Sequence, residues 1–432
     1  MLAFKLFPLA NQLYRQKKYV FAYIIYEWLS TRDSSFDYEQ SRQICETRLR
    51  QVYKNLPKPS PFTYSKKCSY ESIDTRLLNI LLSVSSRFDR DQFLVLNHKI
   101  ANPLLALPLR VNLSVRDQDY GNWQFFFSKI FKFYGVNDFS LVTRKGCFSG
   151  FSSNNHILNH IQFSEVNQVV PATNLSKLVT VLMSAFNAEK TIDYAIRSVL
   201  SQSHSNFELI IVDDASEDRT VEIVNLYAQV DKRIHLYHNQ TRRGTYYNRN
   251  LGMSIAKGDY FTILDADDFM HPQRLFLQLL YLSLCPKKLA VLCYWFRVCA
   301  DGEIVFRNGW GGVYSHEAVA TLMFRRRPVL SKLGYYDEVK FSADTEYLNR
   351  IKKVFGPQTV GVIRKPLTLA ASIDSSLTAN SKTGIDNYLG MSSIRTEYQN
   401  YWSDWHSSQP SNQLFLAIHA DKRKFPAPSE ML

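Results

Sequence analysis

The residues best suited to chemistry are four that follow the apolar run 260–264: Asp265, Ala266, Asp267 and Asp268. Side chains two apart on a strand point the same way, so Asp265 and Asp267 can converge on one ligand while Asp268 turns aside. Carboxylate oxygens are the preferred ligands of Mg²⁺ and Mn²⁺. The tetrad therefore suggests a divalent metal held against a diphosphate, although acidic pairs also form turns and helix caps.

Two further polar clusters follow apolar runs upstream. Residues 178–183 run into the cluster 184–189, and residues 209–212 run into the cluster 213–220. Residues at helical spacing lie at 192–200, 221–227 and 248–256. Further strands are expected at 234–237 and 259–264. Alternation of strands and helices predicts an α/β fold with a mainly parallel sheet and helices on both faces. Ligands of such folds bind at the carboxyl ends of the strands, where all three clusters fall.

From about residue 178 to 378, these clusters in this order resemble family 2 glycosyltransferases of the bacterial capsular and surface polysaccharide type. The fold of that family is the nucleotide-sugar-binding GT-A fold. The segment 212–220 is close to the family's most diagnostic string, and residues 243–252 resemble its Gly-x(3)-Ala-Arg-Asn-x-Gly segment, with Asn248 in place of Ala. The tetrad matches the metal-binding Asp-x-Asp.

The resemblance implies roles for individual residues. Binding of the nucleotide sugar is expected from Ser184, Phe186, Asn187, Glu189, Asp213, Asp214, Arg249 and Asp265. Asp267, aided by Asp265, is expected to hold Mn²⁺ or Mg²⁺. Arg249 near a helix amino terminus suits a diphosphate, but it could also be a surface cation. Phe186 could equally belong to the core.

Transfer of a sugar to a hydroxyl with inversion also needs a base, and a carboxylate suffices. The resemblance places this base at Asp344, where relatives carry Glu-Asp before a helix and this chain carries Ala343-Asp344. Glu346 is the nearest substitute for the missing Glu at the acceptor site. Alternatively, Asp344 caps the helix that follows.

A second departure lies at residues 371–378, where relatives often carry Arg-x-His and this chain has neither residue. If those groups steady the leaving diphosphate, then Arg364, Lys365 or Lys382 must replace them. Trp310 lies between glycines in a segment that suggests a loop, where its ring could stack on an acceptor sugar or pack in the interior.

Composition fits an enzyme with more than one unit. The 432 residues are 45% hydrophobic and 21% charged, and their formal net charge is +13. An anionic membrane surface or a glycan fits this charge better than nucleic acid does, and residues 325–327 and 422–424 are the basic clusters. The sequence lacks a membrane-span pattern and a signal peptide, and its six cysteines show no metal-ligand spacing. We expect a cytoplasmic protein, possibly peripheral on the inner face of the membrane.

Four regions are expected along the chain. Residues 1–60 suggest a tetratricopeptide-like helical hairpin that could contact a partner, and residues 61–176 form an accessory region without recognisable chemistry. The catalytic domain spans residues 177–380. Residues 381–432 should form a helix followed by a loose tail.

These observations predict an inverting, metal-dependent glycosyltransferase. It would move a sugar from a nucleotide-diphosphate donor, UDP-linked, to a glycan or lipid-linked acceptor in polysaccharide biosynthesis. A sugar nucleotidyltransferase is one alternative, but it would need a Gly-rich basic loop where this chain has residues 184–187. A catalytically impaired scaffold is the other, because of the substitution at Ala343.

Overall fold

The structure is a computed structural model, and it describes residues 103–136, 139–141, 156–163, 176–305, 314–372, 384–386, 390–420 and 422–432. All of these belong to one of the chain's two compact units, Leu82–Leu432. The expected hairpin at 1–60, much of the accessory region, Trp310 and Lys382 lie outside the described residues.

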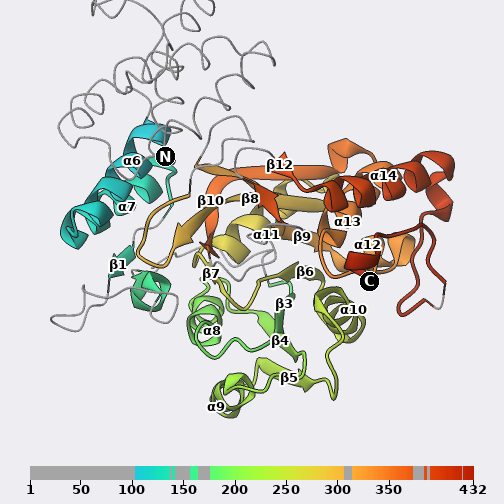
Figure 1. The fold of residues 1–432 in the computed structure, drawn as a ribbon, viewed down its shortest axis with the longest axis horizontal. Coiled ribbons are helices and arrows are strands. Elements are labelled where there is room, and N and C mark those ends of the chain that lie inside the picture. The colour runs from blue at the N-terminus through green and yellow to red at the C-terminus, as the bar shows by residue number, and fades with distance from the viewer. Residues whose placement is uncertain are drawn as a thin grey trace, which may run out of the picture. The chain divides into compact units, whose positions relative to one another are not determined.

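An eight-stranded sheet in the order β5-β4-β3-β6-β9-β8-β10-β7 forms the centre of this unit (Figure 1). The first four strands run parallel to one another. They are β3 (Val179–Ala185), β4 (Phe207–Asp213), β5 (Ile234–His238) and β6 (Tyr260–Ile263). Strand β4 is buried along its whole length, as expected of an apolar strand covered on both faces. The predicted alternation of strands and helices is confirmed here.

The order of these strands determines where the helices lie. Strands β3, β4 and β5 follow one another towards one edge, whereas β6 returns to the other side of β3. Because crossovers between parallel strands are right-handed, the first two crossover helices cover one face and the third covers the other. The three helices are α8 (Ile192–Leu200), α9 (Thr220–Val230) and α10 (Thr245–Ile255). The reversal of strand order beside β3 opens a crevice at the carboxyl ends of β3, β4 and β6.

The other half of the sheet is mixed. Strand β9 (Ser315–Arg325) runs antiparallel to both β6 and β8 (Ala290–Cys299), and β10 (Val360–Ser372) runs parallel to β8. The short strand β7 (Asp268–Met270) closes the edge antiparallel to β10. Helices α11 (Arg274–Leu284), α12 (Arg326–Leu333), α13 (Ala343–Phe355) and α14 (Ser393–Ser408) accompany this half.

The C-terminal segment after α14 is packed, which corrects the expectation of a loose tail. Leu414, Phe425 and Met431 are buried in the same core as α13 and α14. The Lys340 N–H donates to the Met431 carbonyl at 2.8 Å. The segment is polar on average, but Leu414, Leu416, Phe425 and Met431 enter the core, whereas Phe415 and Leu432 stay exposed.

Part of the accessory region packs on the end of β8. Helices α6 (Pro103–Arg116) and α7 (Tyr120–Phe133) form a pair, and the Trp123 indole N–H donates to the Gly302 carbonyl at 2.9 Å. The remaining short elements are β1 (Phe139–Leu141), η1 (Ile157–His160), β2 (Ile161–Phe163), η3 (Pro357–Thr359), β11 (Ile385–Asp386), β12 (Gly390–Met391), η4 (Ser411–Gln413) and η5 (Ser429–Met431).

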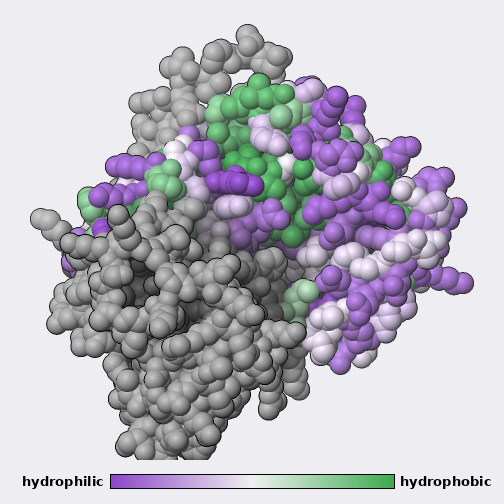
Figure 2. All heavy atoms as spheres, turned by 90° about the horizontal axis from the view of Figure 1, so that it is seen from above, coloured by the Kyte–Doolittle hydropathy of each residue, from purple (hydrophilic) through white to green (hydrophobic). Residues whose placement is uncertain are grey.

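The described chain shows both polar and apolar areas on one face of its surface. Figure 2 shows a hydrophobic area, in green, bordered by hydrophilic residues on the face seen from above. Phe125 and Phe133 on α7 are about half exposed. None of the helices in the described ranges has the length and apolar character that a membrane crossing requires.

Candidate active site

The loops after β3 and β4 are joined by hydrogen bonds. The Asn187 N–H donates to the Ser216 hydroxyl at 2.9 Å, and the Asn187 side-chain oxygen accepts from the Glu217 N–H at 2.9 Å. Glu189 donates its N–H to Asp218 at 3.0 Å. Asn187 reaches this arrangement with a left-handed backbone (φ 47°). These contacts give the first two sequence clusters one shared, fixed shape.

Phe186 is not a core residue. Its side chain is 37% exposed at the rim of these loops, and the Arg242 guanidinium lies 3.9 Å above its ring. A stacked cation–aromatic pair of this kind offers a flat surface, which suits a planar ligand such as a base.

The two aspartates at the end of β4 are buried and differ in their partners. Asp214 accepts from the N–H groups of Arg243 and Gly244 at 2.8 and 2.9 Å, so its carboxylate holds the loop that opens α10. Asp213 accepts from the Ser216 N–H at 3.0 Å and contacts His238 Nδ1 at 2.8 Å. Among the residues that the structure describes, Asp213 Oδ1 has no partner.

Helix α10 links the first loop to the aspartate tetrad. Near its start, the Asn248 amide donates to the Ser184 hydroxyl at 3.1 Å. Arg249 is only 4% exposed, and its Nη2 donates to Asp265 Oδ1 at 2.7 Å. Arg249 is therefore an interior residue aimed at the tetrad, and the alternative of a surface cation is excluded.

The tetrad follows the end of β6 and leads into β7, and its carboxylates have different surroundings. Asp268 belongs to β7 and accepts from the Ala371 N–H at 3.1 Å, whereas the Asp265 side chain is 39% exposed. Burial, with the nearby Asp265, raises the pKa of Asp267 to about 6. Burial also raises the pKa of Asp268, and the charges of Asp267 and Asp265 add to that effect.

Crowded carboxylates of this kind suit a cation. Within the described ranges, no three or more His, Cys, Asp or Glu side chains converge on one point. Asp265 and Asp267 could therefore supply two ligands, and the other positions would be left to phosphate and water, as Mg²⁺ and Mn²⁺ sites for phosphate substrates commonly have them. The donor set fits the expected ion.

Asp344 lies in the first turn of α13, across from α10. Its N–H donates to the Tyr246 hydroxyl at 3.2 Å, and its Oδ1 accepts from the Thr345 N–H at 2.8 Å. The carboxylate is partly exposed and therefore combines a helix-capping contact with access to ligand. The Arg249 guanidinium lies 5.0 Å from the same Tyr246 ring, so one tyrosine connects the tetrad side with Asp344.

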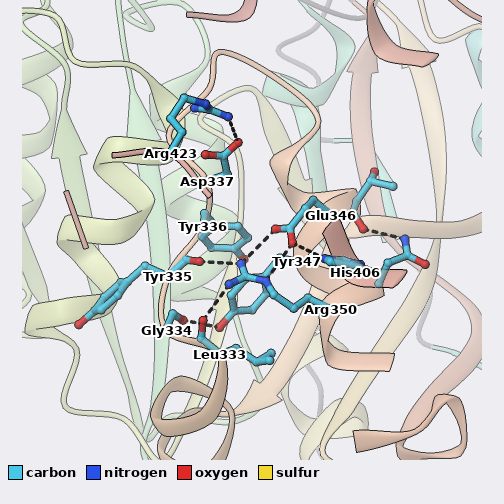
Figure 3. A network of polar contacts seen from close by, with 12 residues as sticks. Leu333, Gly334, Tyr335, Tyr336, Asp337, Glu346, Tyr347, Arg350, His406 and Arg423 are labelled. Atoms are coloured by element: carbon cyan, nitrogen blue, oxygen red, sulfur yellow. Dashed lines mark hydrogen bonds and ion pairs between the residues drawn. The ribbon is translucent and has the colours of Figure 1, made fainter. Parts of the chain in front are cut away.

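Glu346 does not reach the acceptor side, which corrects its expected place there. It is fully buried, and its carboxylate is bound by Arg350 Nη2 at 3.0 Å and by His406 Nε2 at 2.9 Å (Figure 3). Residues two apart on a helix point in nearly opposite directions, so the turn that exposes Asp344 directs Glu346 into the core.

Of the expected cations on β10, neither described one approaches the tetrad. Lys365 Nζ donates to the carbonyls of Tyr134 and Gly135 and so caps the end of α7. Arg364 is exposed.

Two site residues escaped the sequence analysis. Tyr246 lies in the segment 243–252, but no role was predicted for it. Arg297 on β8 interacts with the charges of Asp268, Asp267 and Asp265. A lone arginine in an apolar strand carries no sequence signal, because only the strand order brings it beside the tetrad.

The parallel units, the crevice beside β3 and the Asp-x-Asp after β6 define the GT-A fold of nucleotide-sugar transferases. Residues 180–330 match Glycosyl transferase family 2. Residues 180–330 therefore form a family 2 glycosyltransferase domain.

Curated glycosyltransferases are similar to part of the chain. An uncharacterized glycosyltransferase of Haemophilus influenzae is 42% identical over 102 residues, which make up 24% of this chain and 41% of that protein. The Escherichia coli UDP-Glc:alpha-D-GlcNAc-diphosphoundecaprenol beta-1,3-glucosyltransferase WfaP is 40% identical over 93 residues, covering 22% of this chain and 36% of that protein. The chain thus spans less than half the length of both relatives.

Among solved structures, TarS 1-349 of S. aureus in complex with UDP-GlcNAc has a TM-score of 0.37 and 19% sequence identity. The match covers 46% of this chain and 59% of that one.

Proposed function

We propose that this protein transfers a sugar from a nucleotide-diphosphate donor, UDP-linked, to a hydroxyl of a glycan or lipid-linked acceptor, with inversion at the anomeric carbon. The 2.7 Å contact between Arg249 and Asp265 carries the proposal. It joins the helix amino terminus suited to a diphosphate with the carboxylates suited to its counter-ion. The relative named for transfer from UDP-Glc to a diphosphoundecaprenol-linked sugar supports this donor and acceptor class.

The donor would lie across the crevice. Its base would stack on the Phe186–Arg242 surface, and its diphosphate would approach the start of α10 and Asp265. Asp213, with an oxygen left without a partner in the described chain, is available to a donor N–H of the nucleoside. Asp214 would act indirectly, because its oxygens hold the loop that starts α10.

The reaction would be a single displacement. The acceptor oxygen attacks the anomeric carbon as the bond from that carbon to the diphosphate oxygen breaks, and the electron pair of that bond stays on the diphosphate. The acceptor proton passes to Asp344, whose carboxylate is held by the Thr345 N–H and remains partly exposed.

Asp265 and Asp267 would hold Mn²⁺ or Mg²⁺. When bound, the ion neutralises charge on the diphosphate as it leaves. The three acidic side chains of the tetrad would otherwise repel an anionic donor, which is the physical reason to expect a cation here.

Binding of the donor tests the proposal directly. Purified protein is heated with a panel of nucleotides and nucleotide sugars, each with and without Mn²⁺, because a ligand that binds only the folded state raises the melting temperature. We expect a metal-dependent rise with a UDP-sugar. No rise with any nucleotide would favour the scaffold alternative.

Asp267→Ala tests the metal site. We expect sugar transfer to fall by about 10²- to 10³-fold, the range seen when one electrostatic contact to the transition state is removed, with little change in melting temperature. The matched control is Asp259→Asn at the start of β6, whose partner Lys177 lies 3.9 Å away on the exposed surface. Full transfer by Asp267→Ala would contradict the proposal.

A further inference from the structure

Arg297 is a partly buried cation whose donors are not all used. Within the ranges that the structure describes, its Nε is buried and makes no hydrogen bond. A guanidinium carries five N–H donors, and a buried donor without an acceptor is costly. A natural acceptor for such a donor is a ligand that binds beside it.

The sheet directs Arg297 towards the tetrad. In the strand register, Arg297 on β8 pairs with Ala370 on β10, and Ala370 pairs with Asp268 on β7. Directly paired residues of neighbouring strands project from the same face of a sheet. Because Ala370 is small, it leaves room for the arginine to extend across it, and Trp295 supports the guanidinium from 4.9 Å.

A second unused donor belongs to Arg249, which contacts the tetrad through Asp265. Arg249 donates one terminal nitrogen to Asp265, while its Nη1 is buried and without a partner in the described part of the chain. The register of β8, β10 and β7 brings Arg297 near Asp268, so the carboxylates have two arginines with unused donors on neighbouring elements.

We propose that Arg297 is a diphosphate-binding residue of this site, and that its free Nε donates to a phosphate oxygen of the leaving group opposite Arg249. This inference rests on the proposed function. Arg297 forms no covalent bond. It meets the negative charge that collects on the diphosphate when the bond to the sugar breaks, a role for which the planar guanidinium suits phosphate oxygens.

The competing explanation is purely structural: Arg297 would only neutralise the carboxylates and keep them in place. The two explanations predict different changes in Mn²⁺ affinity when Arg297 is replaced. Removing a cation that binds diphosphate should weaken diphosphate binding but leave Mn²⁺ binding unchanged or tighter, because a like charge is gone. Removing a cation that only positions the carboxylates should weaken both.

The test is calorimetric titration of the full chain with Mn²⁺ alone and with inorganic pyrophosphate in the presence of Mn²⁺. We expect Arg297→Gln to bind pyrophosphate about 10- to 100-fold more weakly, the loss typical of a charge-assisted hydrogen bond, and to bind Mn²⁺ at least as well as the wild type. Arg297→Lys keeps the positive charge but loses the planar guanidinium. Its affinity for pyrophosphate should lie between those of the wild type and Arg297→Gln. Arg364→Gln, an exposed arginine on β10, should match the wild type.

Wild-type affinity for pyrophosphate in Arg297→Gln, or parallel loss of Mn²⁺ and pyrophosphate, would overturn the inference. If Arg297→Gln does not fold, an Arg297→Lys variant with unreduced pyrophosphate affinity would overturn the role of Nε. Failure of the proposed function is distinguishable: wild-type protein would then bind no nucleotide sugar, whatever the titrations of pyrophosphate show.

Discussion

The two halves of this domain use buried carboxylates in different ways. In the half built on β3 and β4, Asp214 binds backbone N–H groups that lie 29 and 30 residues away. Beneath α13, Glu346 binds His406 and Asp337 binds Arg423, at separations of 60 and 86 residues. The first half fixes loops around a ligand, and the second fixes the C-terminal segment to the domain.

This difference in partners indicates which buried carboxylates lie where a ligand could bind. Carboxylates that bind loop backbone keep a crevice open at the strand ends, whereas carboxylates paired with distant cations fill the interior. Asp344 and Glu346 both lie in the first turn of α13. Asp344 faces the crevice side, whereas Glu346 fills the interior. Substitutions in that turn give the sharpest test of the comparison.

Asp344→Asn should have the largest effect on activity. We expect sugar transfer to fall by about 10²- to 10⁴-fold, because the amide cannot accept the acceptor proton, while its oxygen can still cap α13. Transfer rate and melting temperature are measured on the same preparation. A variant that transfers sugar normally would remove Asp344 from the chemistry and leave it a capping residue.

Glu346→Ala should show the opposite pattern. Removing the carboxylate takes the acidic partner from two buried groups, Arg350 and His406, so we expect the free energy of unfolding to fall by about 3–5 kcal/mol. Urea denaturation measures it. Glu397→Ala, which removes an exposed glutamate bound to Tyr401, should change the unfolding free energy by less than about 0.5 kcal/mol. Lost transfer with unchanged stability would return Glu346 to the acceptor site.

A pH test extends the comparison to the accessory segment that precedes η1. Burial lowers the pKa of His156 from 6.5 to about 4. As the pH falls through this window, the unfolded chain takes up a proton that the folded chain refuses, so stability decreases by up to about 3 kcal/mol. His156→Gln should remove this part of the decrease in unfolding free energy between pH 7 and pH 4.5. Parallel pH profiles for the two proteins would contradict the prediction.

Gly252→Ala should have the smallest effect, and it would act on packing. A Cβ at Gly252 would lie 2.1 Å from Leu182 Cδ1, so α10 could not approach β3 as closely. We expect a loss of about 1–3 kcal/mol in unfolding free energy, the usual cost of overpacking, and unchanged transfer per folded molecule. Ser254→Ala on the same helix is the control. A selective loss of transfer would give this family glycine a role in chemistry.

Sequence patterns predicted the half built on β3 and β4 well, because its contacts are local. The strand expected at 209–212 spans 207–213, and the helix expected at 192–200 is α8, Ile192–Leu200. Glu346 was assigned wrongly because proximity in sequence to Asp344 does not mean proximity on a helix. Arg297 was missed because its relation to Asp268 depends on the order β8-β10-β7, which no local pattern encodes.

The hydrogen bonds that close the loop 333–340 have a consequence for folding during synthesis of the protein on the ribosome. Tyr335 and Lys340 donate to the carbonyls of Leu416 and Met431, and Asp337 binds Arg423. A ribosome makes those partners only after the whole sheet has been synthesised. The strands and loops of the crevice are therefore complete in the nascent chain before the partners that close the loop beside Asp344 have been made.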